Sequence, residues 1–145
     1  MRYTLEMELD QTRERVVELF LDHKNLFEWQ EGIVDFEPLG DGDPRGVGAR
    51  NRQVHRMGKR EIEMVETITV ANAPREFAAT YEADGVWNLI ENEFDELSDG
   101  RTKWTLHSEF KCTGMMRIMA FLMPGMFKKQ TLAFMKMFKA FVEKN

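Results

Sequence analysis

The segment from Val47 to Cys112 is the part of the chain that most constrains the fold. Four turn signals divide it into short extended stretches: Gly58-Lys59, Asn72-Ala73-Pro74, Asp84-Gly85 and Ser98-Asp99-Gly100. An Asp-Gly pair between alternating segments is among the strongest short-range signals for a β-hairpin. Because such tight turns join neighbouring strands in antiparallel order, the segment predicts an antiparallel meander.

The flanking segments predict one further strand at the start of the chain and helices on both sides of the meander. Tyr3, Leu5, Met7 and Leu9 alternate with polar residues, which is the period of a half-buried strand. Thr12 is positioned to cap a first helix, residues 22–29 indicate a short second helix, and residues 33–39 indicate another strand. From Phe127, the apolar positions recur at helical spacing: Phe127, Thr131, Phe134, Phe138 and Phe141. They predict a long C-terminal helix that packs on the concave face of the sheet.

This order of elements, β-α-α-β6-α, predicts an α+β fold in which a curved antiparallel sheet wraps around the long C-terminal helix. We expect residues 1–145 to form a single domain, since a chain of this length buries about 68–70% of its unfolded surface. A strongly curved sheet around an amphipathic helix also predicts an internal pocket.

Composition excludes several classes of function. A net charge of −5 argues against nucleic-acid binding, and one cysteine with three scattered histidines argues against a metal site. We expect no cofactor. The longest apolar run, Ile118–Met123, is too short for a transmembrane helix, and the charged N-terminus does not resemble a signal peptide. We therefore expect a soluble, cytoplasmic protein.

Charge and methionine are concentrated at the C-terminus. Residues 115–145 carry six Lys or Arg against one acidic residue, whereas residues 1–114 carry fourteen against twenty-four. Seven of the eleven methionines also lie after residue 114. Flexible methionines suit a ligand entrance, and we expect residues 115–126 to form its rim together with the 40–48 loop, although core filling is the alternative. The lysines predict a solvated helix face, with transient contact with anionic lipid headgroups as a further possibility.

The turn positions predict the register of the strands. A two-residue turn at Gly58-Lys59 pairs Asn51 with Glu66, and the Asp84-Gly85 turn pairs Tyr81 with Asn88. The inward set on the first hairpin is then Asn51, Gln53, His55, Met57, Ile62, Met64, Glu66, Ile68 and Val70. Keeping Phe77, Ala79 and Tyr81 inside places Glu66 opposite Tyr81. We call Asn51, Glu66, Tyr81 and Asn88 the polar belt.

The polar belt has two interpretations besides ligand contact. Glu66 and Tyr81 are candidates for acid–base catalysis, because burial disfavours the charged carboxylate, and His55 is an alternative base. The belt can instead be a purely structural hydrogen-bond network. A one-residue slip in register would dissolve it.

Four local motifs resemble one known family. They are the helix entry Leu9-Asp10-Gln11-Thr12-Arg13-Glu14-Arg15-Val16, the short helix from Asp22-His23 to Trp29, the glycine-rich loop with Gly40-Asp41-Gly42 and Gly46-Val47-Gly48, and the C-terminal Phe/Lys helix. Together with the order of elements, they resemble the START-like (SRPBCC) superfamily with its helix-grip fold, which includes polyketide cyclase/dehydrase-like proteins and relatives of the birch pollen allergen.

The resemblance implies a cavity for a hydrophobic ligand and no shared catalytic residue. Combined with the register, it predicts a cavity lined by Trp29, Asn51, Gln53, His55, Met64, Glu66, Ile68, Tyr81, Asn88, Ile90, Asn92, Trp104, Leu106, Ser108, Phe110, Met115, Met119, Phe127 and Phe134. The leading hypothesis is a carrier or sensor for a lipid, aromatic polyketide or quinone-like molecule. The alternatives are a cyclase or dehydratase that uses Glu66 and Tyr81, and a protein-interaction module built on the Met/Lys-rich C-terminal third.

Overall fold

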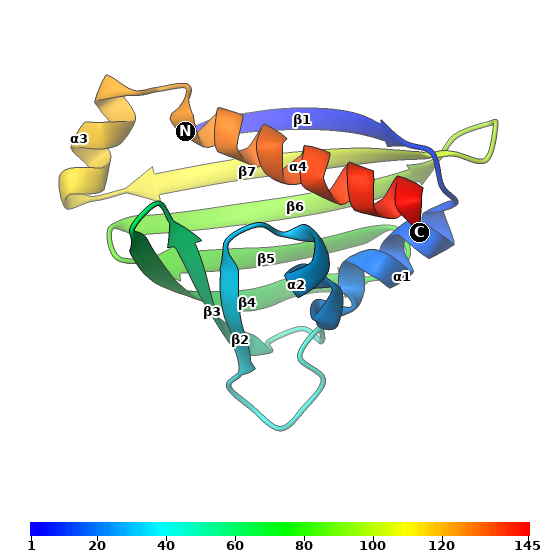
Figure 1. The fold of residues 1–145 in the computed structure, drawn as a ribbon, viewed down its shortest axis with the longest axis horizontal. Coiled ribbons are helices and arrows are strands. Elements are labelled where there is room, and N and C mark those ends of the chain that lie inside the picture. The colour runs from blue at the N-terminus through cyan, green and yellow to red at the C-terminus, as the bar shows by residue number, and fades with distance from the viewer.

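The computed structural model describes all residues from 1 to 145, and its centre is a seven-stranded antiparallel sheet (Figure 1). Its strands are β1 (Arg2–Leu9), β2 (Ile33–Pro38), β3 (Arg50–Met57), β4 (Arg60–Asn72), β5 (Glu76–Ala83), β6 (Val86–Glu96) and β7 (Thr102–Cys112). The spatial order is β1-β7-β6-β5-β4-β3-β2, so the strands from β2 to β7 form the predicted meander and β1 pairs with its last strand. The predicted α+β fold is confirmed.

The register predicted from the turns is also confirmed. Asn51 pairs with Glu66, and Met57 pairs with Arg60 across the Gly58-Lys59 turn. Glu66 lies opposite Tyr81. A three-residue loop before Arg101 pairs Phe94 with Trp104, which keeps both rings on the concave face.

One residue of the predicted inward set is wrong. A bulge in β4 shifts the pairing between Ile68, which faces Ala79, and Val70, which faces Ala78. Since side chains alternate along a strand, the extra residue moves Val70 to the convex face. Met57 was also placed inward, and at the end of the hairpin it is 45% exposed.

The helices close the concave face. They are α1 (Arg13–Leu21), the 3₁₀ turn η1 (His23–Asn25), α2 (Leu26–Trp29), α3 (Gly114–Leu122) and α4 (Met126–Lys144). Thr12 caps α1 by accepting a hydrogen bond from the Arg15 amide, as predicted. Figure 1 shows α4 crossing the sheet over β1, β7 and β6, with α1 and α2 near its C-terminal end.

The fully buried positions of α4 differ in part from the predicted ones, by one residue along the helix. Phe127 and Phe138 are buried as expected, and Thr131, Phe134 and Phe141 are half-buried. Met135 and Val142 are fully buried instead. The helix is thus rotated slightly, so that Phe134 and Phe141 lie at the edges of the apolar stripe.

No helix of the chain is both long and apolar enough to cross a membrane. The element that the sequence did not predict is α3, since residues 115–126 were interpreted only as the rim of a ligand entrance or as core filling. Its residues that face the rest of the molecule are Met116 and Ala120, both half-buried, and none of its residues is fully buried.

Candidate functional site

Glu66 is the centre of a buried polar cluster on the concave face. Its side chain lies in β4 and is 1% exposed, between Asn51 of β3 and Tyr81 of β5. The Tyr81 hydroxyl donates to Glu66 Oε2 at 2.7 Å, and Asn51 Nδ2 donates to Glu66 Oε1 at 3.0 Å. Three of the four residues of the polar belt therefore form one network, as the register predicted.

Arg45 completes this cluster, and the sequence analysis did not identify it. Its Nη1 donates to Glu66 Oε1 at 2.8 Å, and its side chain is only 11% exposed. Its Nε donates to the Leu21 carbonyl at 3.2 Å, and its guanidinium lies 5.3 Å from the centre of the Phe77 ring. The Asp43 carboxylate accepts from the Arg45 amide and turns the chain at this point.

Arg45 lies in the loop of residues 39–49 between β2 and β3, of which residues 40–48 were predicted to form part of a ligand entrance. The available signal was a single cation in a loop directly before the strand that faces Glu66. An uncompensated carboxylate inside a sheet needs a partner, so this cation was the residue to consider.

With Arg45 in place, Glu66 is a paired carboxylate rather than an isolated acid. Its two oxygens accept from one guanidinium, one amide and one phenol. These donors offset much of the cost of removing the carboxylate from water. The expectation that an apolar cavity favours the neutral carboxyl, which was the basis for a proton shuttle, did not include this counterion.

Tyr81 remains a neutral phenol at physiological pH. Burial raises its pKa well above 10.0, and the nearby Glu66 carboxylate raises it further, while Arg45 opposes the shift. Because its proton is directed at Glu66, its oxygen can only accept further hydrogen bonds. Tyr81 can therefore receive a hydroxyl or amide donor of a bound molecule.

The fourth residue of the polar belt, Asn88, does not join this cluster. Its Nδ2 donates to Ser108 Oγ at 2.9 Å and to the Glu109 carbonyl at 3.0 Å. Asn92 is engaged in a similar way, since its Oδ1 accepts from Trp104 Nε1 at 2.9 Å. Both asparagines bind the neighbouring strand and its side chains, which is the structural role that was the alternative to ligand contact.

His55 forms a second, smaller polar group with Gln53. The two side chains meet at 2.9 Å between His55 Nε2 and Gln53 Oε1. Burial lowers the pKa of His55 below 6.5, and the Glu66 carboxylate opposes this shift. The imidazole is thus neutral at physiological pH.

The concave face is closed at one end and accessible at the other. Around α1 and the C-terminal half of α4, six inward side chains are at most 1% exposed: Leu9, Phe94, Trp104, Leu106, Phe138 and Val142. Further along the same face, apolar inward side chains are only half-buried: Ile62, Met64, Ile90, Phe110 and Phe134. Tyr81 is also half-buried, so the Glu66 cluster borders the accessible end.

Two buried polar atoms near this face have no partner in the protein. They are Trp29 Nε1, a donor, and Asn51 Oδ1, an acceptor. Trp29 is 5% exposed, and its ring lies 5.0 Å from the rings of both Phe134 and Phe138. Unpaired buried groups are costly, so these atoms are suited to a bound molecule or water.

The expected common rim of the two segments is wrong. The 39–49 loop and α3 lie at different ends of the molecule (Figure 1). Met115 and Met119, which were placed in the cavity, are 82% and 45% exposed on α3. Gly114 begins α3 with a φ of +59°, which turns the helix away from β7, and this orientation is not encoded in the spacing of the methionines.

Two surface depressions lie near the loop. One of about 440 Å³ is lined by residues of the 38–51 segment, including Pro38, Leu39 and Asn51. Another of about 190 Å³ lies between α1 and the β4–β5 turn, where Val17, Arg45 and Phe77 contribute to its wall. No group of three or more His, Cys, Asp or Glu side chains is arranged to hold a metal ion.

Together, the curved seven-stranded sheet and the long α4 on its concave face form a helix-grip fold. No protein-family model matches the sequence, and a search of curated proteins finds no match. Solved structures do match over nearly the whole chain. The Zhui aromatase/cyclase of Streptomyces sp. R1128 has a TM-score of 0.83 at 13% identity, with 99% of this chain and 94% of that chain covered.

Two further structures show the same fold. A putative uncharacterized protein from Rhizobium leguminosarum has a TM-score of 0.82 at 13% identity, covering 100% of this chain and 95% of the other. Ara h 8.0201 has a TM-score of 0.77 at 10% identity, covering 100% and 99%. At these identities the likeness establishes the fold, and the function has to be argued from the site.

Proposed function

We propose that the protein binds a small hydrophobic or amphipathic molecule between the accessible end of the concave face and α4, as a carrier or sensor. The observation that carries this proposal is the half-buried state of the inward apolar side chains Ile62, Met64 and Ile90 beside the polar cluster around the buried Glu66. Apolar surface that faces inward but stays wet is a favourable place for an apolar ligand.

The polar cluster supports an orienting role. Arg45 and Asn51 hold the Glu66 carboxylate, and the carboxylate in turn holds the Tyr81 hydroxyl at 2.7 Å. This fixes the Tyr81 oxygen as a preorganised acceptor at the border of an apolar surface. An amphipathic molecule with a hydroxyl or amide donor would be oriented by this contact.

A second candidate function is a cyclase or dehydratase that uses Glu66 and Tyr81 as acid–base partners. The short contact between these two side chains favours it, whereas Arg45 and Asn51 weaken it because they already occupy the other carboxylate oxygen of Glu66. Substitution Glu66→Gln distinguishes the two functions. Proton transfer by Glu66 predicts a loss of turnover of about 10²–10⁴-fold in the variant, whereas a binding protein has no turnover to lose.

The binding proposal is tested with an amphipathic fluorescent probe, anilinonaphthalene sulfonate, and two adjacent substitutions on β6. Ile90 faces the accessible concave surface, and Leu89 faces the opposite side of the sheet; both are half-buried. Ile90→Trp fills the proposed site and should weaken probe binding at least about tenfold, which corresponds to about 1.4 kcal/mol. Leu89→Trp is the matched control and should leave the affinity unchanged.

Equal effects of the two substitutions, or no saturable probe binding, would refute the proposed site. Native mass spectrometry of the protein as purified then identifies the class of the natural ligand. We expect a co-purifying small molecule that is retained by the wild type and reduced in Ile90→Trp.

A further inference from the structure

Helix α3 is an apolar helix without a covering partner. Its exposed apolar side chains are Met115, Ile118, Met119, Phe121 and Leu122, followed by Met123, and their exposed fractions run from 45% to 84%. A helix that is hydrophobic all round is normally buried. Here the side directed at solvent, opposite Met116 and Ala120, is formed by Met115, Ile118, Phe121 and Leu122, which are neighbours at spacings of three and four residues.

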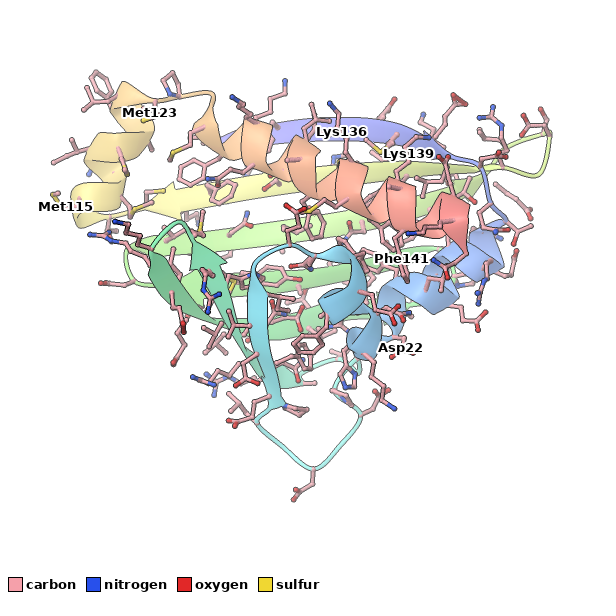
Figure 2. All side chains as sticks on the ribbon, viewed as in Figure 1. Asp22, Met115, Met123, Lys136, Lys139 and Phe141 are labelled. Atoms are coloured by element: carbon pink, nitrogen blue, oxygen red, sulfur yellow. The ribbon has the colours of Figure 1, made fainter.

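The position of α3 makes this apolar surface prominent. The helix lies at one end of the molecule beyond the sheet, and Figure 2 shows Met115 and Met123 at its two ends, on the outline of the protein. Its contact with the body runs through Met116, whose side chain lies against the turn at Gly85. The apolar face therefore protrudes instead of lining a groove.

The charges around α3 are basic. No Asp or Glu occurs between Glu109 and Glu143, and the same stretch contains six Lys or Arg residues. Lys111 precedes the helix, Arg117 lies within it, and Lys128 and Lys129 follow it in the first turn of α4. The acidic residue of the adjoining β5–β6 turn is Asp84. This pattern contrasts with the rest of the chain, whose balance is strongly acidic.

We propose that α3 docks on an anionic lipid bilayer, with its apolar face inserted at the headgroup boundary and the flanking cations on the lipid phosphates. A protruding apolar helix bordered by Lys and Arg is the arrangement that favours the membrane interface. At nine residues, α3 is about 14 Å long, so it lies in the interface and does not span the bilayer, for which about 20 residues are needed.

A second copy of the chain is a weaker occupant for this surface. A stable protein interface buries about 800 Å² on each partner, whereas one face of a helix about 14 Å long and about 10 Å wide covers only a fraction of that area. The predominantly basic surroundings would also repel an identical surface.

The proposal does not depend on ligand binding, and its test uses vesicles alone. Flotation of the protein with vesicles of phosphatidylcholine and phosphatidylglycerol should show binding that falls strongly when phosphatidylglycerol is omitted or salt is raised. The double substitution Phe121→Ser/Leu122→Ser should reduce partitioning at least about tenfold, since it removes two large apolar side chains from the inserted face. Val47→Ser is the control, because Val47 is also exposed and apolar, at 67%, but lies in the distant 39–49 loop.

The electrostatic part is tested separately. Arg117→Gln should weaken binding to anionic vesicles about fivefold, and Lys136→Gln, on the middle of α4, should have a smaller effect (Figure 2). Insertion is tested with Phe121→Trp, whose fluorescence should be quenched by lipids with brominated acyl chains, while that of Val47→Trp should not. Because the substituted side chains are exposed, the variants should keep the wild-type melting temperature.

Absence of binding to anionic vesicles, or binding that survives Phe121→Ser/Leu122→Ser, would overturn the proposal. Concentration-dependent dimerisation that the same double substitution abolishes would also overturn it, in favour of a second copy as the occupant of α3.

Discussion

The ion pair between Arg45 and Glu66 offers the sharpest test of how the 39–49 loop is attached to the sheet. The two side chains are 11% and 1% exposed and meet at 2.8 Å. We consider Arg45→Met, which keeps most of the length and the apolar stem, and Glu66→Gln, which keeps the shape and removes the charge. The double variant completes a thermodynamic cycle.

The expected magnitudes follow from burial. Removing one partner of a buried pair leaves an uncompensated charge and typically costs about 3–5 kcal/mol. For Arg45→Met we expect the lower end, about 3 kcal/mol, because Tyr81 and Asn51 still donate to Glu66. The double variant leaves neither charge unpaired, so its loss should be smaller than the sum of the single losses, with a coupling of about 2–3 kcal/mol.

Urea unfolding at neutral pH measures this coupling, provided that all variants share one slope m. The control cycle uses Arg52 and Asp35, which meet at 3.0 Å with exposed fractions of 32% and 51%. Solvent screens that pair, so its coupling should be much smaller. Equal coupling in the two cycles would refute the conclusion that the Arg45 guanidinium is desolvated and that the loop is fixed by Glu66.

Two further predictions concern stability. Burial lowers the pKa of His55 below 6.5 in the folded protein, so the unfolded chain binds more protons; stability should fall as the pH drops through about 6.5 towards the folded pKa. Between about pH 7.5 and pH 5, unfolding experiments should show a smaller loss of stability in His55→Gln than in the wild type. An equal loss in the two proteins would contradict this assignment. Phe138 is fully buried, and its ring centre lies 5.3 Å from the ring centres of Phe20 and Trp104. Phe138→Ala should therefore lower the free energy of unfolding by about 3–5 kcal/mol. Phe141 is half-buried, so Phe141→Ala should lower the free energy of unfolding clearly less than Phe138→Ala. Equal melting temperatures of the two variants would refute the observed rotation of α4.

The sequence by itself determined the sheet and the pairing within the Glu66 cluster. Gly58-Lys59 and Asp84-Gly85 specify two-residue turns, and a two-residue turn leaves one register for the strands it joins. The first turn places Asn51 beside Glu66, and the apolar alternation of Phe77, Ala79 and Tyr81 places Tyr81 on the same face, opposite Glu66. Turn chemistry together with the period of two was thus sufficient to predict contacts between residues on three strands.

The tertiary structure decided the features that no repeating pattern encodes. The bulge after Ile68 inverts the face of Val70, and its position depends on the bending of β4 around the core. The Asn88 amide donates to Ser108 on the adjacent strand because a buried amide needs a hydrogen-bond partner, and that strand supplies one. Neither outcome can be calculated from alternation alone.

Arg45 and α3 show the physical reason most clearly. Residues 39–49 have no periodicity that would predict the position of Arg45. Its side chain lies inside the fold because it pairs with Glu66, a buried carboxylate 21 residues away in sequence. In α3, the methionines and aromatic residues predict apolar surface, but whether such surface is buried depends on what the rest of the fold offers to cover it. Hydrophobic sequence specifies the tendency to leave water, and only the assembled sheet and helices determine which apolar side chains find a partner.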